Sequence, residues 1–184
     1  MFFATTLLTA AQAETTPLAT GGTYRLVFTD VDRNQLSTAD GHVTIFMVTP
    51  RGEEGKARAL GDRVPDRFIG DPRYRIVIVI NFQGKIRPPF RTVTSAIARH
   101  RLNQEAKRIQ PRYSKAHLTR DPRQDLFAVA DFDGTAVGQL GIDSASAQFA
   151  AFLFDGEGRL LRRWSVVPAQ SELMEALAAA KPRS

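Results

Sequence analysis

The sequence predicts an α/β domain in which a mixed central sheet carries helices on both faces and ends in a β-hairpin and a C-terminal helix. Two apolar, β-branched segments, 42–48 and 74–82, lack a polar face, as strands do when a sheet buries them on both sides. A helix-compatible segment separates them, and the last quarter of the chain reads as a hairpin followed by an amphipathic helix. This order implies parallel crossover units that finish in an antiparallel hairpin.

The 184 residues suit one folded domain, with 43% hydrophobic and 24% charged residues. Residues 1–13 predict a signal peptide, because an apolar run is followed by the small-x-small pattern Ala-Gln-Ala. No Lys or Arg precedes that run, so a buried N-terminal helix is the alternative. We expect a flexible arm at 14–23, one domain at 24–181, no transmembrane segment in the mature chain, and a periplasmic or secreted location.

The first half of the domain predicts two strands and one helix. Residues 24–28 read as a short strand, and 29–41 form a loop rich in Asp, Asn, Ser and Gly. The buried strand 42–48 follows, and a helix is predicted from about residue 52 to residue 63, where Val64-Pro65 should stop it.

The second half begins with the buried strand 74–82. A helix is predicted over 92–110, ending before Pro111, with apolar residues at roughly helical spacing, namely Val93, Ile97, Leu102, Ala106 and Ile109. A strand at 125–131 leads into an Asp-Gly turn, and 147–167 read as a hairpin. Pro168 suits the first turn of a C-terminal helix with Leu173, Met174 and Leu177 on one face.

Three segments resemble the thioredoxin-like redoxins when taken in order. "FTDVDRNQLSTADGHVTIFMV" is similar to the family's entry into the first core strand, and "LFAVADFDGTAVGQLGI" to its inserted strand. "FAAFLFDGEGRLLRRW" is similar to its closing hairpin. The resemblance covers about residues 24–180 and implies a thioredoxin-like fold.

The resemblance fails at the positions that carry the family's chemistry. Redoxins hold a nucleophilic cysteine at the start of the first core helix, where the helix dipole lowers the thiol pKa. That position falls within Arg51 to Lys56, and the chain has no cysteine at all. The family's cis-proline position is held by Phe149. Without a thiolate, thiol–disulfide exchange and peroxide reduction have no nucleophile in this chain.

Positive charge is concentrated in the middle of the chain. Residues 51–123 carry eighteen Lys and Arg against seven Asp and Glu, whereas the flanking segments are slightly acidic. Much of this charge lies in the 85–123 block, with Arg99, Arg101 and Arg108 as candidate anion-binding residues. A solvated basic helix face is the alternative. Nucleic acid is disfavoured as a partner because an exported protein rarely meets it.

Other chemistries find little support. The three histidines lack metal-ligand spacing, so no metal site and no cofactor are expected. The segment 30–35 starts like a calcium loop, but Gln35 and Gly41 stand where that loop needs Gly and Glu, which favours an Asp-rich β-turn. The sequence has no G-x-S-x-G nucleophile elbow, no P-loop and no G-x-G-x-x-G dinucleotide motif, so we assign no catalytic residue. A hydrolase site of unrecognised type is a further alternative.

The sequence therefore predicts a non-redox, thioredoxin-like binding or scaffold domain that holds a peptide or protein partner. The candidate partner-binding residues surround the position of the missing cysteine and are Arg51, Glu53, Glu54, Lys56 and Phe149. The alternative is an anion-binding surface protein that acts through the 85–123 block. A bland interpretation of Glu53 and Glu54 is that acidic residues simply favour the first turn of a helix.

Overall fold

A computed structural model describes residues 16–84, 86–143, 145 and 148–182 of the protein. The strands are β1 (Val27–Thr29), β2 (Gln35–Ser37), β3 (Val43–Pro50), β4 (Tyr74–Asn81), β5 (Leu126–Asp131), β6 (Ala150–Phe154) and β7 (Leu160–Trp164). The helices are α1 (Glu54–Arg63), α2 (Arg91–Lys115), α3 (Thr135–Gln139) and α4 (Gln170–Ala179). Short 3-10 turns occur at Asp66–Phe68, Pro88–Phe90 and Pro122–Asp125. The predicted signal peptide lies outside the described residues.

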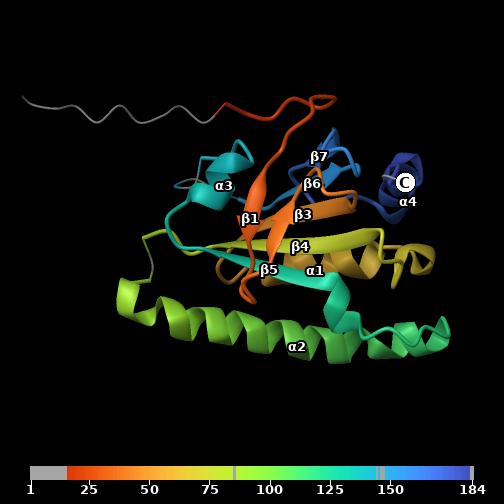
Figure 1. The fold of residues 1–184 in the computed structure, drawn as a ribbon, viewed down its shortest axis with the longest axis horizontal. Coiled ribbons are helices and arrows are strands. Elements are labelled where there is room, and N and C mark those ends of the chain that lie inside the picture. The colour runs from red at the N-terminus through yellow and green to blue at the C-terminus, as the bar shows by residue number, and fades with distance from the viewer. Residues whose placement is uncertain (1–15, 85, 144, 146–147, 183–184) are drawn as a thin grey trace, which may run out of the picture.

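The central sheet has five strands in the order β5-β4-β3-β6-β7. Strands β3, β4 and β5 are parallel, whereas β6 and β7 are antiparallel to their neighbours. The chain moves in one direction from β3 through β4 to β5, so right-handed crossovers place α1 and α2 on the same face. Figure 1 shows both helices beneath the sheet and α3 on the opposite side.

Each face of the sheet has its own core. The side chains of Phe28, Phe46, Val77, Val79 and Phe152 pack on the face that the β1–β2 hairpin and α3 cover. On the other face, α1 and α4 pack over β3 and β6, while α2 packs over β5. The predicted mixed sheet with helices on both faces, closing hairpin and C-terminal helix is confirmed.

Several details differ from the sequence prediction. The loop 29–41 contains β2, which pairs with β1, and α3 follows the Asp-Gly turn after β5. Both elements are too short to give a periodic pattern. In α4, Leu173 and Leu177 are buried but Met174 is exposed, so these three residues do not share one face.

Helix α2 continues through Pro111 instead of ending before it. Proline removes one helical hydrogen bond, but contacts on either side of it hold the last turn. Arg112 Nη2 donates to the carbonyl oxygen of Val64 at 2.7 Å, and the Tyr113 hydroxyl donates to the carboxylate of Asp125 at 2.6 Å. Tertiary contacts therefore outweigh the local preference.

The arm predicted to be flexible is, from Thr16 onward, held against the domain. Gly21 N donates to Leu160 O at 2.7 Å, and Leu160 N donates to Gly22 O at 2.9 Å. Thr23 forms a bridge with Arg159, and Leu18 packs against the core. The arm thus covers the outer edge of β7, where unpaired backbone groups would otherwise be exposed.

Candidate functional site

The three parallel strands end together at one edge of the sheet, with Pro50, Asn81 and Asp131 as their last residues. The N-termini of α1 and α2 follow β3 and β4, so both lie toward this edge. Ligands of open α/β sheets bind outside the carboxyl ends of the strands. This edge is therefore the first place to look for a site.

The turn between β3 and α1 occupies the position where redoxins hold their cysteine. Gly52 has φ 95°, a left-handed conformation that glycine adopts without strain. The Lys56 ammonium pairs with the Glu53 carboxylate at 2.6 Å, and Arg101 Nη1 pairs with Glu54 Oε1 at 2.9 Å. Both carboxylates near the helix N-terminus are thus neutralised within the chain, while Arg51 has no ionic partner among the described residues.

Phe149 does not share this surface. Phe149 is 3% exposed, and its side chain belongs to the core cluster that includes Ala151, Leu153 and residues of α1. The prediction that Phe149 contacts a partner is therefore corrected, because a buried ring cannot reach one. The structure keeps Arg51, Glu53, Glu54 and Lys56 in one turn at the surface and buries Phe149 in the core.

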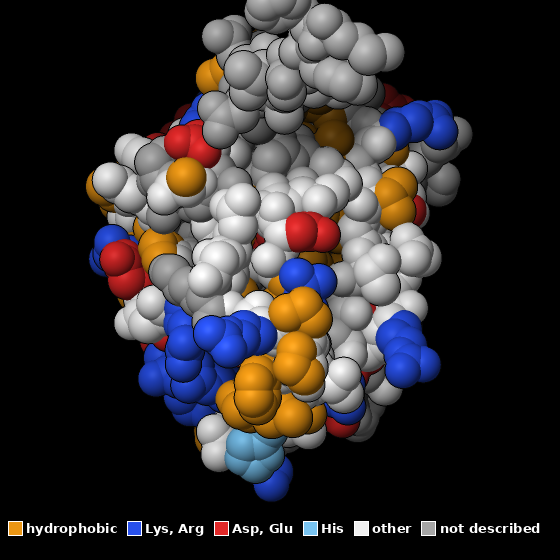
Figure 2. Space-filling view, turned by 90° about the vertical axis from the view of Figure 1, so that its left-hand side faces the viewer, with side chains coloured by type: hydrophobic (Ala, Val, Ile, Leu, Met, Phe, Trp, Pro, Cys, Tyr) orange, Lys and Arg blue, Asp and Glu red, His pale blue; other side chains and the backbone are white. Residues whose placement is uncertain are grey.

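Exposed apolar residues lie on the N-terminal part of α2. Phe90, Val93 and Ile97 are 59%, 56% and 50% exposed, at the spacing of one helix face. In Figure 2, which looks onto this end of the molecule, hydrophobic side chains gather beside a group of Lys and Arg. We call Phe90, Val93 and Ile97 the apolar stripe. Val93 and Ile97 belong to the same helical series in the sequence as Leu102 and Ala106, which are buried.

The stripe is exposed because α2 extends beyond the start of α1, its neighbour on the same face of the sheet. A helix of 25 residues spans about 37 Å, whereas α1 with 10 residues spans about 15 Å. Ile97 lies one helical turn before Arg101, which pairs with the first residue of α1. The N-terminal turns of α2 therefore project past α1 (Figure 1).

The three candidate anion-binding arginines are engaged inside the chain. Arg99 pairs with Asp32 at 3.1 Å, Arg101 with Glu54, and Arg108 with both Asp62 at 2.5 Å and Glu105 at 2.6 Å. The hydrogen bonds that Arg108 donates to the carboxylates of Glu105 and, to a lesser extent, Asp62 raise the pKa of Arg108 above its ordinary value. Much of the predicted positive charge is thus neutralised locally.

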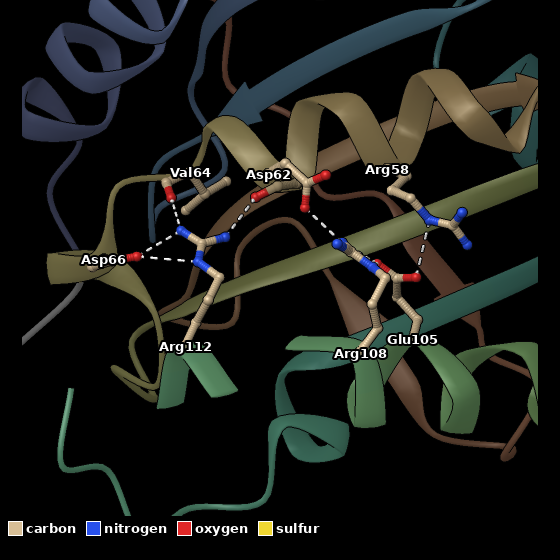
Figure 3. A network of polar contacts seen from close by, with 8 residues as sticks. Arg58, Asp62, Val64, Asp66, Glu105, Arg108 and Arg112 are labelled. Atoms are coloured by element: carbon tan, nitrogen blue, oxygen red, sulfur yellow. Dashed lines mark hydrogen bonds and ion pairs between the residues drawn. The ribbon is translucent and has the colours of Figure 1, made fainter. Parts of the chain in front are cut away.

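Four such contacts join α1 and the turn that follows it to α2, and we call them the ion-pair seam. Besides Arg101–Glu54 and Arg108–Asp62, Arg58 pairs with Glu105 at 3.2 Å and Arg112 with Asp66 at 2.7 Å. Figure 3 shows the last three reaching across from α2 to α1 and its C-terminal turn. The paired residue numbers rise together, so the two helices run in parallel.

Metal binding finds no support in the part of the chain that the structure describes. No group of three or more potential ligands occurs there. The Asp30 carboxylate accepts hydrogen bonds from the backbone N–H groups of Asp32 and Asn34 at 2.9 and 2.7 Å, as an Asx-type turn does. Among the described residues, no helix is both long and apolar enough for a membrane span.

Buried Asp131 has a structural role at the end of β5. Its carboxylate accepts hydrogen bonds from Gly134 N and Val137 N at 2.9 and 2.8 Å and so holds the start of α3. Burial raises the pKa of this carboxyl group. The predicted Asp-Gly turn leads directly into α3.

Comparison with known proteins identifies the fold. A DsbF homologue from Corynebacterium diphtheriae is 14% identical with a TM-score of 0.51, over 96% of this chain and 99% of that one. The exposed lipoprotein thioredoxin Etrx1 from Streptococcus pneumoniae is 12% identical with a TM-score of 0.50, over 84% and 98%. No protein-family model matches the sequence, and no curated protein is similar to it. The fold is thioredoxin-like, in a chain without cysteine.

Proposed function

We propose that this chain is a non-redox, thioredoxin-like binding domain of an exported protein, and that it holds a polypeptide partner at the edge where its parallel strands end. The lack of cysteine removes the thiolate that thiol–disulfide exchange needs. Export is supported by the sequence of residues 1–13 and by similarity in fold to an exposed lipoprotein.

The observation that carries the proposal is the apolar stripe of Phe90, Val93 and Ile97 next to the turn 51–56. Exposing three large apolar side chains on one helix face costs free energy in a monomer unless a partner covers them. Interfaces commonly combine such an apolar centre with a polar rim. Here exposed Arg51 and Arg87 supply basic residues at this end of the molecule.

These features define the partner's chemistry. Apolar side chains of the partner would pack on the stripe, and acidic residues around them would pair with Arg51 and Arg87. The projecting turns of α2 provide a rigid helical surface, so the domain itself needs no rearrangement on binding.

Site-specific photo-cross-linking tests the proposal. A photoreactive phenylalanine analogue at position 90 is expected to give one discrete adduct in the native compartment, and Ile97→Asp should abolish it. The matched control is Val166, which is 70% exposed outside this edge. The same analogue at position 166 should not give that adduct, and Val166→Asp should leave the adduct from position 90 intact.

Two results would contradict the proposal. Identical adducts from positions 90 and 166, or an adduct from position 90 that survives Ile97→Asp, would show that no partner recognises this edge.

A further inference from the structure

A cavity of about 590 Å³ lies between the sheet and helices α1 and α2. Its volume is within the range of small-molecule binding sites, roughly 300–1,000 Å³. Strand β4 forms its floor through Ile76, Ile78 and Ile80, and the two helices form its walls. The cavity lies in the layer between sheet and helices, and at Glu54 and Gly55 it borders the edge proposed above to bind a polypeptide.

The burial pattern of β4 gives independent evidence for this cavity. Val77 and Val79 point to the opposite face and are 0% exposed. Ile76 and Ile78 are only partly buried, although β4 has a neighbour on each side and helices above it. Their exposed surface faces the cavity that they line.

Small residues in the covering helices explain why the space is not filled. Gly61 of α1 and Ala98 of α2 line the cavity where larger side chains would normally reach the sheet. A Cβ atom added to Gly61 would meet no other atom within 4 Å. Gly61 has ordinary helical geometry, so it is not required there by a left-handed backbone.

The charged residues around the cavity already have partners. The seam neutralises Glu54, Arg58, Arg101, Glu105, Arg108 and Arg112. Buried Arg75 pairs with Asp40 at 2.9 Å, and Asp125 pairs with Arg120 at 2.7 Å while accepting the Tyr113 hydroxyl. A charged ligand would lose its hydration without gaining a counter-ion, which is costly.

The shape of the cavity and the chemistry of its lining indicate which class of ligand it can bind. From Tyr74 to Ile80 the floor extends for about 20 Å along the strand, and both residues line the cavity. We propose that the cavity binds an uncharged, elongated apolar molecule with an alkyl chain, which enters through the ion-pair seam. Exposed ion pairs contribute little stability, so opening the seam has a low cost.

Fluorescence titration tests this assignment on the purified chain. The neutral dye N-phenyl-1-naphthylamine should bind saturably with one site per chain, and 1-dodecanol should displace it. Dodecanoic acid has the same chain length but is ionised at neutral pH. We expect it to displace the dye only at a concentration at least about tenfold higher than that of 1-dodecanol.

Two variants locate the site. Gly61→Leu, which fills the cavity, should weaken dye binding by at least about tenfold, whereas its matched control Gly61→Ala should stay within about threefold of the wild type. Glu105→Gln, which removes the partner of Arg58 and one partner of Arg108, should speed both dye entry and exit in stopped-flow measurements.

Three outcomes would overturn the proposal. They are non-saturable dye binding, equal displacement by alcohol and acid, and a folded Gly61→Leu variant with wild-type affinity. Circular dichroism reports whether Gly61→Leu folds. If it does not, unchanged entry and exit rates in Glu105→Gln would themselves contradict the proposed route.

Discussion

The two faces of the central sheet differ in how completely they are packed. On the face under the β1–β2 hairpin and α3, Phe46 contacts Phe28 and Phe154 with ring centroids 4.7 and 5.9 Å apart, and Val77 and Val79 are fully buried. On the face under α1 and α2, Ile76 and Ile78 of the same strand border a cavity of about 590 Å³. The two faces of β4 thus border a close-packed core on one side and a core with a large cavity on the other.

This difference indicates where stability and binding are located. Close packing on one face stabilises the fold through dispersion and burial of apolar surface. The other face keeps small residues in its helices and joins them by long charged side chains. The following predictions test this division, from the largest expected effect to the smallest.

A large residue of the close-packed core should have the largest effect on stability. Phe46→Ala is expected to lower the free energy of unfolding by about 3–5 kcal/mol, because it leaves a cavity in a filled core. Ile78→Ala should cost about 2 kcal/mol, the low end for such changes, because the side chain already borders empty space. Urea denaturation of both variants measures the difference. Equal losses would contradict unequal packing.

The ion pair between buried Arg75 and partly exposed Asp40 ties the β1–β2 hairpin to the sheet. Arg75 Nε donates to Thr44 Oγ1 at 3.0 Å, and its Nη2 atom also donates to Ser37 O. Asp40→Asn should cost about 2 kcal/mol at neutral pH, less than a fully buried pair because Asp40 is partly exposed.

The pH dependence of this contribution has a definite sign. Burial tends to raise the pKa of Asp40, but the hydrogen bond with His42 and the charge of Arg75 outweigh it and hold the pKa below 3.8. The ionised carboxylate therefore stabilises the fold above its unfolded pKa, and this stability is lost as pH falls from about 5 to 2. The difference in unfolding free energy between wild type and Asp40→Asn should shrink over that range. A constant difference would exclude the pair as its source.

Two glycines give a matched comparison of open and filled space. Gly61→Ala should raise the free energy of unfolding by about 0.5–1 kcal/mol, because its new methyl group meets no atom and alanine favours the helix. Gly158 has φ 85°, and a Cβ atom there would collide with Tyr24 O, so Gly158→Ala should be destabilising. Thermal unfolding distinguishes the two. A destabilised Gly61→Ala variant would mean that the space near α1 is already filled.

The ion-pair seam should contribute least. Glu105→Gln removes the charge that faces Arg58 and Arg108, yet exposed pairs contribute about 0–1 kcal/mol. We expect a loss within that range that becomes smaller at high salt, measured by denaturation at two ionic strengths. A loss above about 2 kcal/mol would show that the seam stabilises the fold too strongly to open for a ligand.

Local patterns in the sequence predicted most of the fold. The apolar segments that became β3 and β4, the hairpin of β6 and β7, and α4 all have clear periodicity or turn residues. The prediction failed at β2 and α3, which are too short to show a period, and at Pro111, where contacts of Arg112 and Tyr113 override a local rule.

The site was predictable only in part. The missing cysteine could be read directly, and so could the charged turn that replaces it. The periodicity of Val93 and Ile97 predicts a helix but does not say whether another helix lies beside that turn. The cavity was hidden for a similar reason, because Gly61 and Ala98 come from helices whose spacing over β4 is a tertiary property.

The unequal packing of the two sheet faces is tested most directly by xenon binding in a crystal of the protein. Apolar cavities take up xenon, whereas close-packed cores do not. We predict xenon density between Ile78 and Gly61, and none beside Val77 and Val79 on the opposite face. Absence of xenon between α1, α2 and β4, or equal occupancy on both faces, would contradict the central claim.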